Sequence, residues 1–73
     1  MNIIQQIKYD CYPRARWVRE QTAQGIMLDE LELQSARNLA NNAWKWDFDS
    51  AATELSKAIK ENQDLKTDLK TEE

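Results

Sequence analysis

The chain is 73 residues long, with 10 basic and 13 acidic side chains, a formal net charge of −3 and no histidine. It contains one cysteine, one glycine and one proline. These counts exclude an internal disulfide, a cysteine or histidine metal cage, a histidine general base and a glycine-rich phosphate loop. We therefore expect a protein with no enzymatic activity, no cofactor and no bound metal ion.

The composition predicts an all-α fold. Ala, Leu, Glu, Lys, Gln, Arg and Met make up 40 of the 73 residues, and these types lose little side-chain freedom in a helix. We expect a small bundle of three helices, or four if the first is broken. Residues 1–63 are predicted to form one helical domain. Residues 64–73 are predicted to be a charged helix extension or a disordered tail.

The first segment has one apolar helical face. Spacings of three and four residues join its members, which are Ile4, Ile7, Cys11, Ala15, Val18 and Thr22. Pro13 interrupts this run, because proline lacks a backbone donor and clashes with the preceding turn. One arrangement is a short helix to about Cys11 followed by a second that starts near Pro13, and the other is a single kinked helix. The proline favours the break. Gly25 is expected to end the segment in a left-handed conformation.

A second helix is expected from Asp29 to about Trp46. Asp29 is a suitable N-cap, and the acidic residues Glu30 and Glu32 suit the positive end of the helix dipole. The predicted buried stripe consists of Leu28, Leu31, Ser35, Leu39 and Ala43, flanked by the small or aromatic residues Ala36, Ala40 and Trp44.

A third helix is expected to be capped by Asp49 or Ser50, with a stripe of Phe48, Ala52, Leu55 and Ile59. N-capping also explains Asp47 and Asp49 better than a calcium loop does, because no glycine lies near. The sequence of residues 64–67 repeats directly in residues 68–71, which is typical of a solvated helix end. Alternatively, a heptad pattern predicts a two-stranded coiled coil, with Asn62 fixing its register among Phe48, Ala51, Leu55, Ala58, Leu65 and Leu69.

Large aromatic side chains are the strongest indication of a binding surface. Trp44 and Phe48 can share a helical face, whereas Trp46 must point elsewhere. Tryptophan is enriched among the residues that contribute most to protein interfaces. The predicted protein interface consists of Trp17, Trp44, Trp46, Phe48, Leu55, Ile59 and Leu65.

A basic segment offers an alternative function. Residues 1–25 carry a net charge of +2, whereas residues 26–73 carry −5. Arginine with tyrosine suits phosphate contacts and base stacking. The candidate nucleic-acid residues are Lys8, Tyr9, Tyr12, Arg14, Arg16 and Arg19. Reading of DNA by the second helix is not expected, because that helix begins with three carboxylates. Cys11 is interpreted as a small core residue rather than a nucleophile.

The sequence thus predicts a small accessory or regulatory protein that binds another protein by helix packing. A domain of this size buries little surface, so self-association as a homodimer is also expected. The alternative is a small regulator that contacts RNA or DNA. No apolar run is long enough to span a membrane and no signal peptide is recognisable, so we expect a cytoplasmic protein without a membrane or small-molecule partner. The composition is typical of accessory proteins of bacteria and their phages.

Overall fold

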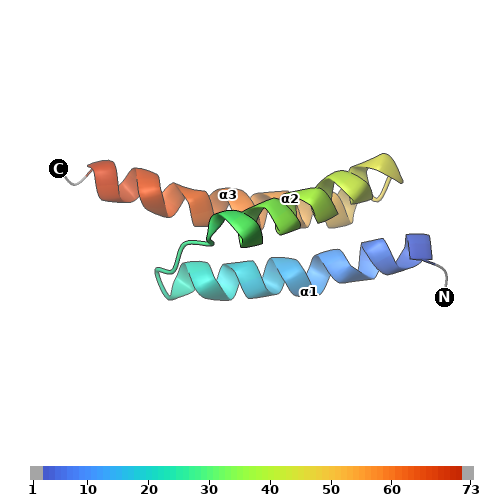
Figure 1. The fold of residues 1–73 in the computed structure, drawn as a ribbon, viewed down its shortest axis with the longest axis horizontal. Coiled ribbons are helices and arrows are strands. Elements are labelled where there is room, and N and C mark those ends of the chain that lie inside the picture. The colour runs from blue at the N-terminus through green and yellow to red at the C-terminus, as the bar shows by residue number, and fades with distance from the viewer. Residues whose placement is uncertain (1–2, 72–73) are drawn as a thin grey trace.

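The computed structural model describes residues 3–71, with side chains as far as Lys66. It contains three helices, α1 (Ile3–Ala23), α2 (Glu30–Lys45) and α3 (Asp49–Thr71), and no strand within residues 3–71. Successive helices alternate in direction, so that α1 and α3 point the same way and α2 runs antiparallel to both (Figure 1). The predicted all-α bundle of three helices is therefore confirmed.

The expected break at Pro13 does not occur. Pro13 lies inside α1, which continues without interruption from Ile3 to Ala23. Pro13 is exposed, whereas Cys11, Ala15 and Val18 are buried on the opposite side of the helix. Packing of that continuous apolar face outweighs the loss of one backbone hydrogen bond at the proline.

Two left-handed residues end the first two helices. Gly25 has φ 74°, and the amides of Gly25 and Ile26 donate to the carbonyls of Thr22 and Gln21, which is the Schellman arrangement. The expected role of Gly25 is confirmed. Asp47 has φ 63°.

The turn at Asp47 has the same hydrogen-bond pattern. The Asp47 amide donates to the Trp44 carbonyl, and the Phe48 amide donates to the Ala43 carbonyl. Asp47 therefore ends α2, and the predicted N-cap role of Asp47 is wrong. The first turn of α3 starts from the Phe48 carbonyl, which accepts from the Ala52 amide, while Asp49 lies inside the helix.

The N-terminus of α2 is closed as expected, by a capping box. The Asp29 carboxylate accepts from the Glu32 amide at 2.8 Å, and the Glu32 carboxylate accepts from the Asp29 amide at 3.1 Å. Two amides that a helix leaves without partners are thereby satisfied by two side chains three residues apart.

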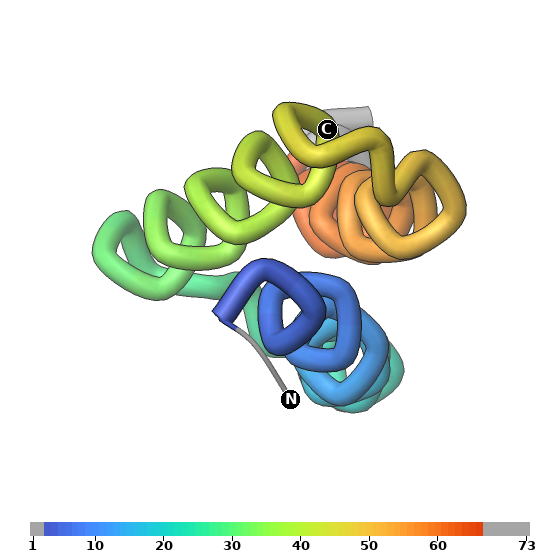
Figure 2. The backbone as a smooth tube through the Cα atoms, turned by 90° about the vertical axis from the view of Figure 1, so that its right-hand side faces the viewer, coloured from blue at the N-terminus to red at the C-terminus, as the bar shows by residue number. Residues whose placement is uncertain are grey.

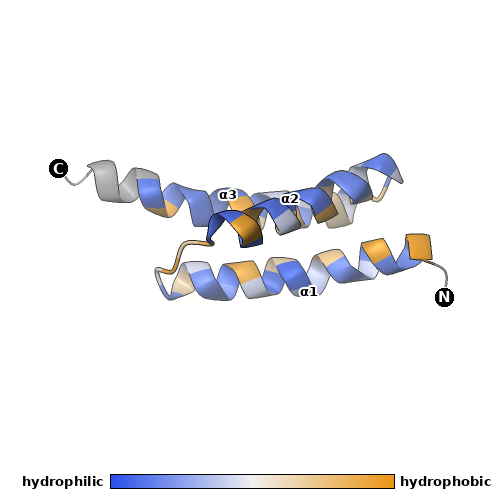
Figure 3. Cartoon of the chain, in the orientation of Figure 1, coloured by the Kyte–Doolittle hydropathy of each residue, from blue (hydrophilic) through white to orange (hydrophobic). Residues whose placement is uncertain are grey.

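The core is built largely from small side chains. Leu55, Val18 and Cys11 are its largest fully buried apolar residues. The remaining positions include seven alanines, namely Ala15, Ala36, Ala40, Ala43, Ala51, Ala52 and Ala58. Alanine lets helix backbones approach closely, which increases van der Waals contact without long side chains. Figure 3 shows that hydrophilic residues predominate along α2 and the coloured part of α3, with hydrophobic residues interspersed.

The predicted stripe of α2 is wrong in part. The face that packs inward is Leu33, Ala36, Ala40 and Ala43, while Leu31 is 81% exposed and Ser35 is exposed. Figure 2 shows α2 crossing the other two helices obliquely, with its first turns lying furthest to the side. This crossing brings the alanine face of α2 onto α3 and leaves the Leu31 side open.

Asn62 is the buried polar side chain of the described core, with 1% exposure. Its Oδ1 accepts from the Leu28 amide at 2.9 Å. Its Nδ2 donates to the Ile26 carbonyl at 2.9 Å and to the Thr22 hydroxyl at 3.0 Å. Asn62 therefore fixes the connection between α1 and α2 onto α3.

This arrangement argues against the coiled-coil alternative. Ala51, Leu55, Ala58 and Asn62 are buried within the chain, so their seam faces α1 and α2 instead of a second copy. The backbone of α3 remains helical to Thr71. The side chain of Leu69 lies outside the described residues, as do residues 72 and 73.

Candidate protein-binding surfaces

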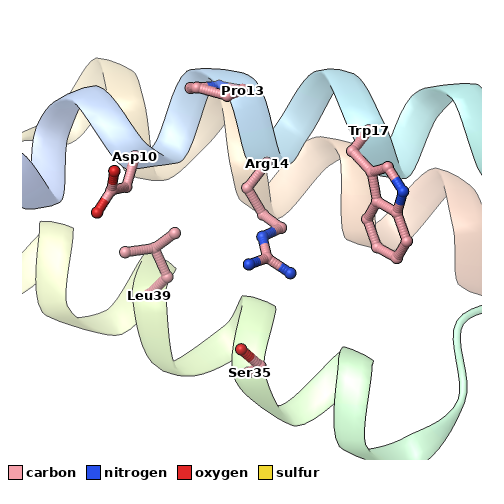
Figure 4. Close-up of a pocket in the computed structure, with 6 residues that line it drawn as sticks. All are labelled: Asp10, Pro13, Arg14, Trp17, Ser35 and Leu39. Carbon is pink, nitrogen blue, oxygen red and sulfur yellow. The ribbon is translucent and has the colours of Figure 1, made fainter.

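A cleft of about 670 Å³ lies between α1 and α2. Figure 4 shows Asp10, Arg14 and Trp17 extending from α1 toward Ser35 and Leu39 of α2, with Pro13 on the same stretch of α1. The cleft forms because α2 packs obliquely and makes fewer contacts with α1 than with α3. The apolar surface of Trp17, Leu39 and Pro13 is thus combined with one acidic and one basic side chain.

Polar side chains in the cleft are held in place by neighbours on α1. The Arg14 guanidinium lies 5.7 Å from the centre of the Trp17 ring, within the range of a cation–π interaction. The Asp10 carboxylate accepts a hydrogen bond from the Gln6 amide group at 2.9 Å. The aromatic and charged side chains of the cleft therefore contact neighbours on α1 in the free chain.

The predicted interface residues fall into three groups. Trp44 and Trp46 are each 44% exposed near the end of α2, on different sides of that helix. Trp17, Phe48 and Leu65 are partly buried, and Trp17 and Phe48 pack against the core. Leu55 and Ile59 are 0% and 5% exposed. Those two side chains are used inside the bundle and have almost no surface for a partner.

The basic cluster of α1 is split between two sides of the helix. Arg14 faces α2 in the cleft described above, whereas Tyr12, Arg16 and Arg19 line a different depression beside Glu54 of α3. Arg19 donates to Glu54 at 3.0 Å and to Glu61 at 3.3 Å.

These two ion pairs change what Arg19 can bind. Hydrogen bonding to the Glu54 carboxylate, followed by that to Glu61, raises the pKa of Arg19 above its usual value. Its charge is balanced by two carboxylates, which makes it a poor phosphate ligand. Of the predicted nucleic-acid residues, Lys8, Tyr9, Tyr12 and Arg16 remain exposed on this side of α1.

A second groove, which sequence reasoning missed, separates α2 from α3 and measures about 300 Å³. Its lining comprises Arg37, Ala40, Asn41, Ser56, Ile59, Lys60 and Gln63. Arg37 and Lys60 are 23 positions apart in the sequence, and neither belongs to a charged run. The spacing of cations along one helix therefore gave no sign of this site.

The lone cysteine of the chain lies in the core. Cys11 is fully buried, and burial raises the pKa of its thiol, with a smaller contribution from the Asp10 charge. No group of three or more His, Cys, Asp or Glu side chains among the described residues is placed to hold a metal ion. None of the helices, over the described range, has the length and hydropathy needed to cross a membrane.

Comparison with protein-family models, with curated proteins and with solved structures gives no match to this chain.

Proposed function

We propose that the chain is a small non-enzymatic accessory protein that binds another protein by taking an amphipathic helix into the cleft between α1 and α2. The observation that carries this proposal is the ordered mixture of Trp17, Leu39, Asp10 and Arg14 in one cleft between two helices. Helix-in-groove binding needs an apolar surface to anchor the incoming helix and polar groups at its edge to set the orientation.

The exposed side of α2 extends this surface. Leu31, Ser35 and Leu39 are spaced by four residues, so they form one ridge along α2. Leu31 is 81% exposed at the end of that ridge, beyond the residues that line the cleft. A partner helix along this ridge buries Leu31 together with the exposed part of Leu39.

Self-association belongs to the same proposal. A chain of 73 residues with an alanine-rich core buries little apolar area, so pairing of two copies adds stability. Exposed Trp44 and Trp46 are suitable anchors for such contacts. A cytoplasmic location agrees with this role. Sedimentation at micromolar concentration tests the pairing, and a single 8.6 kDa species would remove it.

The alternative function, a regulator that contacts RNA or DNA, rests on Lys8, Tyr9, Tyr12 and Arg16. It is the weaker proposal, because Arg19 is already paired with two carboxylates and Arg14 lies on another side of α1. Replacement of Arg16 by Gln is expected to reduce any salt-sensitive binding to nucleic acid. Absence of a shift with RNA and DNA at low salt would end this alternative.

The cleft is tested by filling it from an exposed position. Ser35→Arg places a long charged side chain in the cleft, whereas Asn38→Arg makes a similar change on exposed α2 surface that does not line it. Affinity capture from expressing cells should lose its specific partner protein with Ser35→Arg and keep it with Asn38→Arg. Capture of the same protein by both variants would contradict binding in the cleft.

A further inference from the structure

The groove between α2 and α3 brings two unpaired cations together. Arg37 comes from α2 and Lys60 from α3, and both line the same groove. Among the residues with described side chains, the ion pairs are those of Arg19 with Glu54 and Glu61, so neither Arg37 nor Lys60 has a carboxylate partner. Both side chains are exposed, so an anionic partner can contact the two cations together.

The rest of the lining suits an anionic occupant. None of the described residues that line the groove is acidic, and α2 carries no acidic residue after Glu32. Asn41, Ser56 and Gln63 supply amide and hydroxyl donors beside the two cations. Carboxylate oxygens accept hydrogen bonds from all of these groups, and those from arginine and lysine are the strongest.

The groove runs between two neighbouring helices, which suits a further helix as its occupant. Ala40 and Ile59 are 3% and 5% exposed, so they close its floor without projecting into it. Two antiparallel helices with small residues between them form the kind of furrow in which the ridge of a further helix packs. Carboxylates three or four positions apart on such a helix lie on one face, within reach of both Arg37 and Lys60.

We propose that the α2–α3 groove is a second binding site, which takes an acidic helix of a partner protein through Arg37 and Lys60. It is distinct from the cleft of the proposed function, since the two lie on opposite sides of α2 and share no lining residue. The protein then acts as an adaptor that holds two helices, one mainly by apolar contact and one by charge. A nucleic acid is disfavoured as the occupant, because the groove itself offers two cations, which is a small footprint for a polyanionic backbone.

The probe for this site is a blocked peptide of repeated Glu-Ala-Ala-Glu units, with the corresponding Gln peptide as the neutral control. Binding to the full chain is followed by the backbone amide shifts of the ¹⁵N-labelled protein, which also report whether each variant is folded. We expect shifts around Arg37, Asn41 and Lys60 with the Glu peptide and none with the Gln peptide. Arg37→Gln and Lys60→Gln should each weaken binding about fivefold.

Lys57→Gln is the matched control. Lys57 is exposed on α3, three positions before Lys60, and does not line the groove. If binding is specific to the groove, Lys57→Gln leaves the affinity unchanged. An equal loss with Lys57→Gln and Lys60→Gln would show general charge attraction and overturn the proposal. So would the absence of shifts at low salt, or tighter binding of single-stranded DNA at the same residues.

Failure of the proposal for the α2–α3 groove can be distinguished from failure of the proposed function, which uses the α1–α2 cleft. Ser35→Arg lies in the other cleft and should leave binding of the Glu peptide intact. Loss of peptide binding in that variant would mean that the two sites are not separate and would contradict the adaptor arrangement.

Discussion

Replacement of Asn62 by leucine tests how the bundle is held together. The change keeps a side chain of similar size but removes three hydrogen bonds, to the Leu28 amide, the Ile26 carbonyl and the Thr22 hydroxyl. The Leu28 amide is buried, so it finds no water to replace the lost acceptor. We expect Asn62→Leu to lower the free energy of unfolding substantially.

The magnitude follows from the unsatisfied groups. Leaving one buried donor or acceptor without a partner costs about 1–3 kcal/mol, so loss of the acceptor for the buried Leu28 amide costs about that much. The Ile26 carbonyl is part-buried, so water replaces some of its lost bond. A domain of 73 residues has a total stability of about 4–11 kcal/mol. The substitution should therefore remove a large fraction of the stability of the fold.

Urea denaturation followed by circular dichroism at the helix band measures this loss. Asn38→Leu is the matched control, because it makes the same chemical change at an exposed position of α2, and we expect an effect within about 0.5 kcal/mol. Thr22→Val removes one of the three bonds and should cost about 1 kcal/mol.

An increase in the free energy of unfolding on Asn62→Leu would refute the reasoning. In a two-stranded coiled coil, a seam asparagine lowers stability, so its replacement by leucine stabilises the assembly. A variant Asn62→Leu that is as stable as the unmodified protein, or more stable, would mean that Asn62 does not hold the α1–α2 connection as described.

Four further substitutions and one chemical probe have expected outcomes. Pro13→Ala should raise the free energy of unfolding by about 1–3 kcal/mol, because it restores a donor inside α1; an unchanged or lower thermal midpoint would speak against a continuous helix. Asp47→Gly should stabilise the fold by about 0.5–1 kcal/mol, and Gly25→Ala should destabilise it by a similar amount, because both positions have positive φ. Urea midpoints that move the other way would contradict the two Schellman turns. Ala43→Leu should cost about 1–3 kcal/mol by overpacking the contact of α2 with the core, and a neutral result would mean that the site is not close-packed. The Cys11 thiol should react with a thiol reagent at neutral pH only after unfolding, because burial raises its pKa and blocks access; rapid reaction of the folded protein would place it outside the core.

Much of the local structure was predictable because it depends on neighbouring residues. The capping box of Asp29 and Glu32 is closed by side chains three positions apart, and the turn at Gly25 needs only a residue that adopts positive φ. The turn at Asp47 follows the same rule, yet aspartate is a common N-cap as well. Its two roles are indistinguishable until the positions of both flanking helices are known.

The sequence pointed to part of one candidate binding site and to none of the other. Trp17 was singled out as an aromatic anchor and lines the α1–α2 cleft, and its role in binding stays a prediction. The α2–α3 groove was not foreseen, because Arg37 and Lys60 are brought together only by the packing of α2 on α3. Likewise, the split of Arg14 from Arg19 depends on which side of α1 each neighbouring helix occupies.

By itself, the sequence determined that this chain is helical, that Asp29 caps the second helix and that Gly25 ends the first. Helix formation and capping are satisfied by hydrogen bonds within a few residues, so the pattern of residues is sufficient. Only the tertiary structure decided that α2 buries alanines and exposes Leu31, that Asn62 ties a connection instead of a coiled coil, and that two cations share a groove. Each of these outcomes depends on a contact between helices distant in the sequence, and the lowest free energy of packing selects among faces that the sequence pattern leaves nearly equivalent.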